Sequence, residues 1–206
     1  MVLDARFIRG IWVSGMATSS TPVLRVPVFD ANAENVQPYG FLLGDDVCKP
    51  GLGIPFYQDR VLEGENVDFI YRGRATFRTA KILPGYPPVI WLERHLYMTQ
   101  MFIALGQAPF IMVMAPPNHQ AGEDLPSLSQ VQALRFQAGQ GLLLHLGTWH
   151  DFPIAGDDRP VVILTANSDE VVTALSQMQT PGEMNQGDVY KISLPQRLNC
   201  EIQLEF

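Results

Sequence analysis

Two short segments of the sequence, 92–106 and 139–154, carry three of the four histidines and side chains that could share one metal ion. Glu93 and His95 are two residues apart, so in a β-strand both side chains would point to the same face. Gln100 follows five residues after His95, where a tight turn could bring its amide beside them. His150, in the second segment, adds an imidazole from a later strand. The pattern predicts a single site.

The residue types indicate what this site could bind. Neutral imidazoles and a carboxylate suit zinc, nickel, manganese or iron, whereas a carboxamide is a poor metal ligand. We predict a divalent metal at His95, His150 and Glu93, with Gln100 as a weak further ligand, and no organic cofactor. The sequence contains no Gly-x-Gly-x-x-Gly, no Gly-x-Ser-x-Gly and no Cys-x-x-Cys, which argues against nucleotide cofactors and a serine nucleophile.

Both segments resemble motifs of the cupin superfamily. Residues 147–150, Gly-Thr-Trp-His, are similar to the second cupin motif, and residues 93–100 are similar to the first. Glu93 stands where many cupins have histidine, and Gln100 where they have glutamate. The resemblance implies an all-β fold, a cupin-type double-stranded β-helix (jelly-roll barrel) with a few short helices.

A narrower resemblance covers roughly residues 24 to 168. Segments 92–95, 99–103, 114–116 and 147–150 look like those of bacterial and fungal ureidoglycolate lyases. Members of that family split ureidoglycolate, a carbinolamide, into glyoxylate and urea, which implies an enzyme of allantoin degradation in purine metabolism. Residues 151–153 and the loop 118–124 depart from the family pattern, so another carbinolamide or hydroxy acid stays open as substrate.

The family's reaction implies roles for individual residues. With a metal at His95, His150 and Glu93, the metal would bind the substrate carboxylate and hydroxyl and lower the pKa of the hydroxyl. Without a metal, His150 or Glu93 would be the general base, and Lys81 or an arginine would fix the carboxylate. Each also has a structural interpretation: His95 and His150 could be hydrogen-bonded inside a barrel, and Glu93 could pair with Arg94 or another arginine.

Other residues are candidates for the substrate pocket. Arg72 and Arg74 alternate along a predicted strand, and one inward-pointing cation would hold a carboxylate well. A solvated outer sheet face is the alternative. Tyr57 and Trp149 are candidates for the pocket wall.

Two other classes of function stay open. A cupin oxidoreductase (dioxygenase) using iron and oxygen would need tight metal retention, which Gln100 disfavours. A non-catalytic small-molecule-binding protein on the same barrel would bind an organic acid without turnover. No feature of the sequence excludes it.

Composition is consistent with a small-molecule enzyme. The 206 residues suffice for one all-β domain. We expect a flexible leader over residues 1–20 and a single cupin-like domain over 21–206. A net charge of −7 argues against nucleic acid, and no apolar run reaches the length of a membrane span. Two distant cysteines suit the cytoplasm. A charged fraction of only 17% suggests surface covered by a second subunit, as in a homodimer.

Frequent Gly and Pro divide the chain into about eleven short strands, as in a sandwich or barrel. The predicted strands are 23–28, 68–75, 77–83, 89–93, 101–105, 110–115, 132–136, 141–146, 161–165, 188–193 and 201–204. One predicted helix follows Asp30 as its cap and runs through Val36. The other spans Asp169–Gln177, capped by Ser168 or Asp169.

Overall fold

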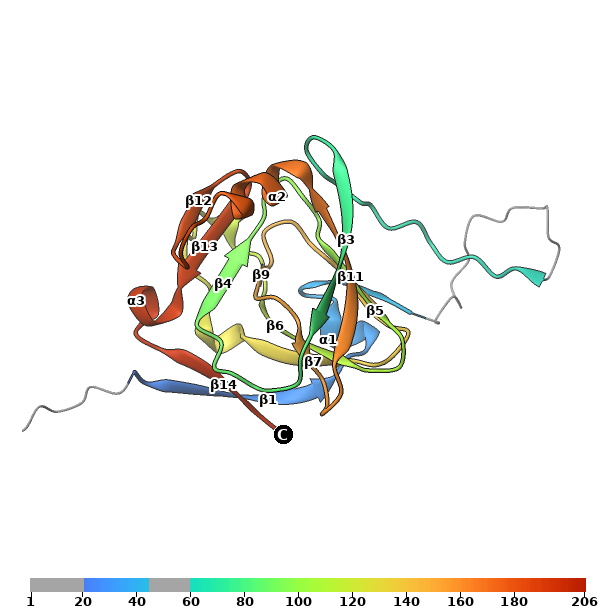
Figure 1. Ribbon diagram of the computed structural model, residues 1–206, viewed down its shortest axis with the longest axis horizontal. Coiled ribbons are helices and arrows are strands. Elements are labelled where there is room, and N and C mark those ends of the chain that lie inside the picture. Colours follow the sequence, from blue (N-terminus) through green and yellow to red (C-terminus); the bar gives the residue numbers. More distant parts are fainter. Residues whose placement is uncertain (1–20, 45–59) are drawn as a thin grey trace, which may run out of the picture.

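Two β-sheets form the body of the protein (Figure 1). The computed structural model describes residues 21–44 and 60–206. The leader expected over residues 1–20 and the candidate pocket residue Tyr57 lie outside the described residues. The predicted all-β fold of the cupin type, with few and short helices, is confirmed.

The larger sheet carries most of the predicted site. Eight strands follow in the order β12-β13-β4-β9-β6-β7-β1-β14, and β10 pairs with β6. Their bounds are β1 Val23–Asp30, β4 Trp91–Arg94, β6 Phe110–Ala115, β7 Gln132–Phe136, β9 Trp149–His150, β10 Ile154–Ala155, β12 Met184–Gln186, β13 Val189–Ser193 and β14 Glu201–Glu205. Strand β1 runs parallel to both β7 and β14, and the other pairs are antiparallel.

The smaller sheet closes the other side of the barrel. Its order is β2-β8-β5-β11-β3, with all neighbours antiparallel. The bounds are β2 Gly40–Leu43, β3 Ala75–Ile82, β5 Met101–Leu105, β8 Gly141–Leu144 and β11 Val161–Ser168. Strands β2 and β3 are therefore the edges of this sheet.

Helices are short and lie around the sheets. They are α1 Ala33–Val36, α2 Asp169–Ser176 and α3 Leu194–Leu198, with the 3-10 turns η2 His119–Ala121 and η3 Leu128–Gln130. Ser168 caps α2 as predicted, because its side chain accepts the N–H of Val171. The cap of α1 is Asn32 rather than the expected Asp30. In the described part of the chain, no helix has the length and apolarity needed to cross a membrane.

The larger sheet has an apolar layer on each face. Along β6, Phe110 and Met112 belong to the core between the two sheets, whereas Ile111 and Val113 belong to a second core on the opposite face. Because successive side chains of a strand point to opposite faces, the whole of β6 is buried. The face between the sheets is called the inner face below, and the opposite one the outer face.

The predicted strands agree with the structure in some segments and differ in others. Strands β5, β6 and β7 have the bounds expected from the sequence. The strand predicted over residues 68–75 is wrong, because the chain bends there and Gly73 adopts a left-handed conformation with φ of 82°. Strands β2, β9, β10 and β12 were not predicted. Three of them have only two or three residues, too few for a periodic pattern.

Candidate active site

Glu93, His95 and His150 meet in one buried cluster. Glu93 on β4 is the register partner of His150 on β9, so both side chains leave the sheet on the same face, and His95 follows directly after β4. The Glu93 Oε1 atom lies 3.8 Å from Nε2 of His95 and 3.9 Å from Nε2 of His150. The three ligand atoms lie within 4.8 Å of one another. The predicted grouping of these residues is thus what the structure has.

The His95 imidazole is oriented by the backbone of a distant strand connection. Its Nδ1 atom lies 2.6 Å from the carbonyl oxygen of Asp188. Because a carbonyl only accepts hydrogen bonds, Nδ1 carries the proton and Nε2 has a free lone pair. This Nε2 atom is buried and has no hydrogen-bond partner. A buried, unpaired lone pair facing a carboxylate is what a metal ligand requires, so the donor set fits a divalent cation.

The His150 imidazole is held from both sides. Its Nδ1 atom lies 2.9 Å from the Thr148 carbonyl, and Nε2 lies 2.7 Å from the side-chain amide of Gln100. That amide in turn lies 2.7 Å from the side chain of Asn167. Burial lowers the pKa of His150 to about 4, with the neighbouring His95 adding to the effect. His150 is therefore neutral at neutral pH.

Both ring nitrogens of His150 face oxygen atoms, Nδ1 the Thr148 carbonyl and Nε2 the Oε1 atom of Gln100. A neutral imidazole has one N–H and can donate to only one of them. The Gln100 side chain is fixed in turn, because its Nε2 donates to Asn167 Oδ1 and Asn167 Nδ2 donates to Thr165 Oγ1. Gln100 thus covers Nε2 of His150 and must move aside when this nitrogen binds a cation.

Lys191 neutralises Glu93 from the neighbouring strand. The two residues are register partners on β13 and β4, and Lys191 Nζ lies 3.0 Å from Glu93 Oε2. Burial would raise the pKa of Glu93, but Lys191 and the two imidazoles outweigh it and hold the pKa below its usual value. The alternative interpretation, in which Glu93 pairs with Arg94, is wrong, because Arg94 points to the outer face and pairs with Asp124.

Asp151 follows His150 and faces the same lysine. Its Oδ1 atom lies 3.9 Å from Lys191 Nζ. Burial raises the pKa of Asp151 to about 6, although Lys191 acts in the opposite direction. The cluster therefore contains one cation between two carboxyl groups, of which Asp151 is the weaker acid.

Trp149 does not line this site. It is fully buried in the core on the outer face, where its indole N–H donates to Asn118 Oδ1 over 2.9 Å. Since His150 points to the inner face, its neighbour in the strand has to point away from it. The predicted place of Trp149 in the pocket wall is therefore wrong.

The three predicted substrate-binding cations have other surroundings. Arg72 pairs with Glu170 of α2 through contacts of 2.6 and 2.8 Å, and it stacks on the Tyr97 ring. Arg74 lies 3.9 Å from Asp169. Lys81 is exposed on β3 opposite Val162, so it points away from the core that its neighbours Ala80 and Ile82 face. The structure does not bring these side chains to Glu93.

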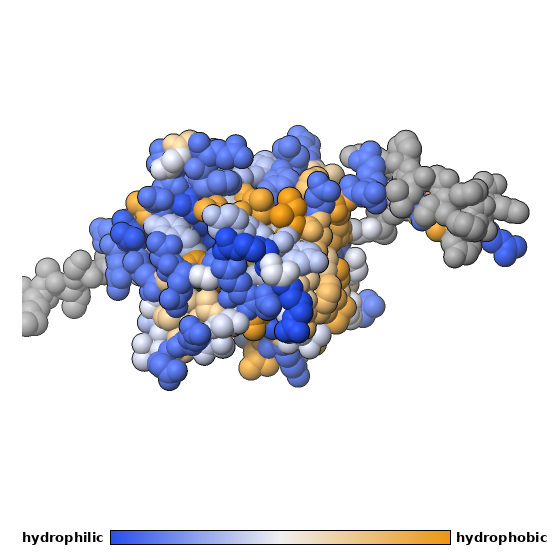
Figure 2. Space-filling model, turned by 90° about the horizontal axis from the view of Figure 1, so that it is seen from above, coloured by the Kyte–Doolittle hydropathy of each residue, from blue (hydrophilic) through white to orange (hydrophobic). Residues whose placement is uncertain are grey.

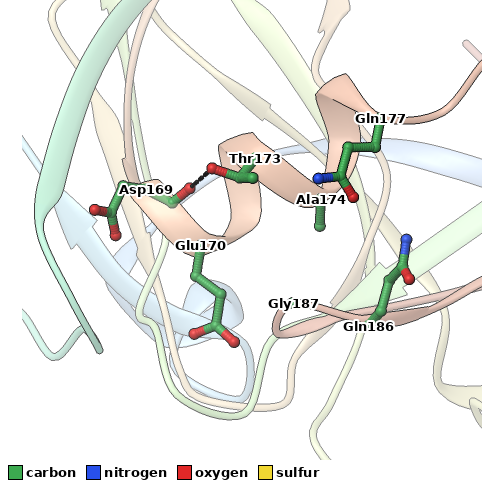
Figure 3. Close-up of a pocket in the computed structure, with 7 residues that line it drawn as sticks. All are labelled: Asp169, Glu170, Thr173, Ala174, Gln177, Gln186 and Gly187. Atoms are coloured by element: carbon green, nitrogen blue, oxygen red, sulfur yellow. Dashed lines mark hydrogen bonds between the residues drawn. The ribbon is translucent and has the colours of Figure 1, made fainter.

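A cavity of about 400 Å³ lies beside the Arg72 pair, between α2 and the connection from β12 to β13 (Figure 3). Its wall includes Glu170, Thr173 and Gln186. Asp188 follows directly in sequence after the residues of this wall, and its carbonyl oxygen contacts Nδ1 of His95. Asp188 also accepts the backbone N–H groups of Leu96 and Tyr97 through its carboxylate. The cavity thus lies next to Asp188, which orients His95, and not next to the ligand atoms of the cluster.

Sequence reasoning missed Lys191, Asp188 and Asp151. Asp188 and Lys191 come from segments without a motif, whereas Asp151 directly follows the second motif. Register between distant strands cannot be read from one sequence. One signal was present: Lys191 lies in a predicted strand, where a cation between apolar neighbours indicates a buried partner.

Together, a two-sheet barrel and a buried glutamate–histidine–histidine group define a cupin-type protein with a candidate metal centre. A family model described as ureidoglycolate lyase matches residues 63–173, more than half of the chain. The protein belongs to the ureidoglycolate lyase family. The matched region includes Glu93, His95, Gln100 and His150 but ends before Lys191.

Individual relatives agree over shorter segments. A ureidoglycolate lyase of Azotobacter vinelandii is 35% identical over 86 residues, which cover 41% of this chain and 49% of that protein. One of Pseudomonas putida is 41% identical over 59 residues, covering 29% and 32%. The aligned part of the chain thus spans about half or less of these relatives.

Solved structures show weaker likeness. An oxalate decarboxylase of Lactobacillus farciminis, solved as a formate complex, matches 61% of this chain and 28% of its own, with 16% identity and a TM-score of 0.34. Similarity at this level carries no information about chemistry.

Proposed function

We propose that this protein is a lyase that cleaves the carbon–nitrogen bond of ureidoglycolate, or of a closely related carbinolamide, to give glyoxylate and urea. The observation that carries the proposal is the buried cluster of Glu93, His95 and His150 in a chain of the ureidoglycolate lyase family. We place the enzyme in allantoin degradation within purine metabolism, as the substrate implies.

The substrate carbon bears a hydroxyl, a carboxylate and the ureido nitrogen. Neutral His150 or the Glu93 carboxylate would accept the hydroxyl proton, the carbon–nitrogen bond would break as the carbonyl forms, and the departing nitrogen would take up a proton. General base catalysis of this kind contributes roughly 10² to 10⁴-fold in rate.

A divalent metal, such as nickel, manganese, zinc or iron, fits the donor set of Glu93, His95 and His150. When bound, it would act as a Lewis acid that lowers the pKa of the substrate hydroxyl. Gln100 is a weak further ligand at best, because its amide is already engaged with His150 and Asn167. No organic cofactor is part of the proposal.

The proposed partners are the small organic acid substrate and a second copy of the chain. Figure 2 shows an apolar band on the side where Figure 1 places β3, β5 and β11. Phe77 of β3 and Leu105 of β5 are 62% and 42% exposed. Large exposed apolar areas mark interaction surfaces, and a homodimer through this face would also cover the edge strand β3. We further propose a cytoplasmic location, without membrane or nucleic-acid partners.

The test is glyoxylate release from racemic ureidoglycolate by the purified protein, with and without chelator and with nickel or manganese added back. We expect release well above the spontaneous rate, lost in His150→Ala and reduced by chelator. Release equal to the spontaneous rate under all metal conditions would contradict the proposal. Exposed Arg25→Met, on β1, serves as the matched control and should retain wild-type turnover.

A further inference from the structure

Among the described residues, Lys191 is the cation that contacts the reacting groups, and it lies outside the family-matching region. That region ends at residue 173, whereas Lys191 lies on β13. Its side chain is 20% exposed. The Nζ atom is directed at Glu93 over 3.0 Å, with Asp151 at 3.9 Å. An ammonium has three N–H donors, so these contacts leave donor capacity for another acceptor.

A cavity of about 420 Å³ opens onto the same lysine. Its wall includes Trp91 of β4, Met184 of β12 and Leu175 of α2. Trp91 and Glu93 are two residues apart on β4, and Met184 is the register partner of Lys191. The side chains of Trp91, Met184 and Lys191 therefore leave the large sheet on its inner face, the face of the Glu93 cluster. The wall of the cavity is mostly apolar, and Lys191 is the charged residue in it.

We propose that Lys191 binds the carboxylate of a small 2-hydroxy acid that enters through this cavity, and so determines specificity for acids over neutral analogues. The inference rests on the proposed function for the identity of the substrate. A carboxylate in this position would otherwise face the like charges of Glu93 and Asp151. Lys191 is the described cation that contacts the cluster, whereas Arg72 and Arg74 are paired with α2.

The experiment compares glycolate with its neutral analogue glycolamide, by calorimetric titration of the metal-loaded protein. The variants are Lys191→Met, which keeps the apolar stem, and Lys191→Arg, which keeps the charge; Arg25→Met is the control. A charge-assisted hydrogen bond predicts that Lys191→Met weakens glycolate binding by about tenfold or more and glycolamide binding by less than about threefold. Lys191→Arg should recover part of the loss. The metal content of each variant is measured in parallel.

A role confined to supporting Glu93 gives a different result. In that case Lys191→Met would weaken both ligands equally or lose metal in proportion, and the proposal is overturned. Wild-type protein that does not prefer glycolate to glycolamide also overturns it. The lyase proposal is tested separately, because glycolate binding needs no turnover. Lys191-dependent binding without glyoxylate release would contradict the proposed lyase activity and leave the role of Lys191 intact.

Discussion

The two faces of the strands β4, β9 and β13 deal with buried charge in opposite ways. Consecutive residues alternate between them: Glu93 points inward and Arg94 outward, and likewise His150 and Trp149. On the outer face, Arg94 donates to the Glu123 carbonyl over 2.7 Å and to Asp124 over 3.1 Å. It also lies over the Trp149 ring. Its two Nη atoms are thus paired within the protein, whereas its Nε atom is buried without a hydrogen-bond partner.

The inner face leaves a functional group open. His95 Nε2 is buried without a hydrogen-bond partner, and Lys191 reaches a cavity. A buried group without a partner costs stability unless a ligand completes it. Buried charge alone therefore does not identify an active site, since both faces have it. The distinguishing features of the inner face are a buried acceptor that faces a carboxylate and a cation that borders a cavity.

Removal of the Glu93 carboxylate should give the largest difference in turnover between variants of the inner face and variants of the outer face. Glu93→Gln removes the anionic ligand and keeps the side-chain volume. We expect glyoxylate release to fall by about 10²-fold or more, as for loss of a group that acts on charge in the transition state. Steady-state assays check this, with circular dichroism to confirm that the variant is folded. Turnover within threefold of wild type would move the chemistry away from this cluster.

Asp188 supports the inner face from a distance. Its φ of 57° is unusual for a residue other than glycine, and its carboxylate accepts two backbone N–H groups beside His95. Asp188→Ala should weaken metal binding by about 10 to 100-fold, as for other groups that orient a ligand histidine. Asp188→Asn, which keeps an acceptor and tolerates this conformation, should lose less. Competition with a chromogenic chelator gives both affinities, and equal losses in the two variants would refute the account.

The outer face should affect stability and leave the chemistry unchanged. Arg94→Met retains most of the contact with Trp149 but removes the hydrogen bonds. We expect a loss of about 1 to 3 kcal/mol in the free energy of unfolding, discounted because Asp124 is largely exposed. Urea unfolding measures this loss, and turnover at saturating substrate should stay within about threefold. A drop in turnover comparable to that of Glu93→Gln would remove the distinction between the faces.

The smallest effect concerns acid stability of the metal-free protein. His150, with a pKa lowered to about 4, takes up a proton on unfolding between about pH 6.5 and 4, so stability should fall as the pH falls through that range. Asp151 works the other way: its pKa is raised to about 6, so it favours the folded state at low pH and loses that contribution as pH rises toward 6.

These two residues should partly offset each other between pH 4 and 6. Asp151→Asn removes the opposing contribution, so thermal unfolding of this variant should depend more steeply on pH over that interval than in wild type, by a few degrees. An unchanged slope would show that Asp151 titrates normally in the folded protein.

Much of the site could be predicted, because its ligands lie in two local motifs. The two-residue spacing of Glu93 and His95, and the Gly-Thr-Trp-His segment, needed only strand geometry and a family resemblance. Predicting which cations belong to the site required knowledge of how distant strands pair. Lys81, Arg72 and Arg74 are close in sequence to the first motif, but their side chains lie elsewhere. Lys191 reaches Glu93 only through the pairing of β13 with β4, across about a hundred residues.

The strands, like the site residues, were predictable where local sequence determines them. Strand β6 is an apolar run between Pro109 and Pro116, and β5 is an apolar run that ends at Gly106, so these ends are marked locally. Strand β9 has two residues and exists only because β4 and β6 pair on either side of it. The direction of Trp149 follows from that pairing, and from no pattern in its own segment.

The parallel pairing of β1 with β14 affects how the protein is made. It joins residues 23–27 to residues 201–205, so the large sheet is completed only when nearly the entire described chain has left the ribosome. Asp188 and Lys191 emerge shortly before that, long after the histidine motifs. Topologies dominated by such distant contacts fold slowly. Until then β1 and β4 would expose free edges, and a nascent chain would hold its two histidines without the groups that orient and neutralise them.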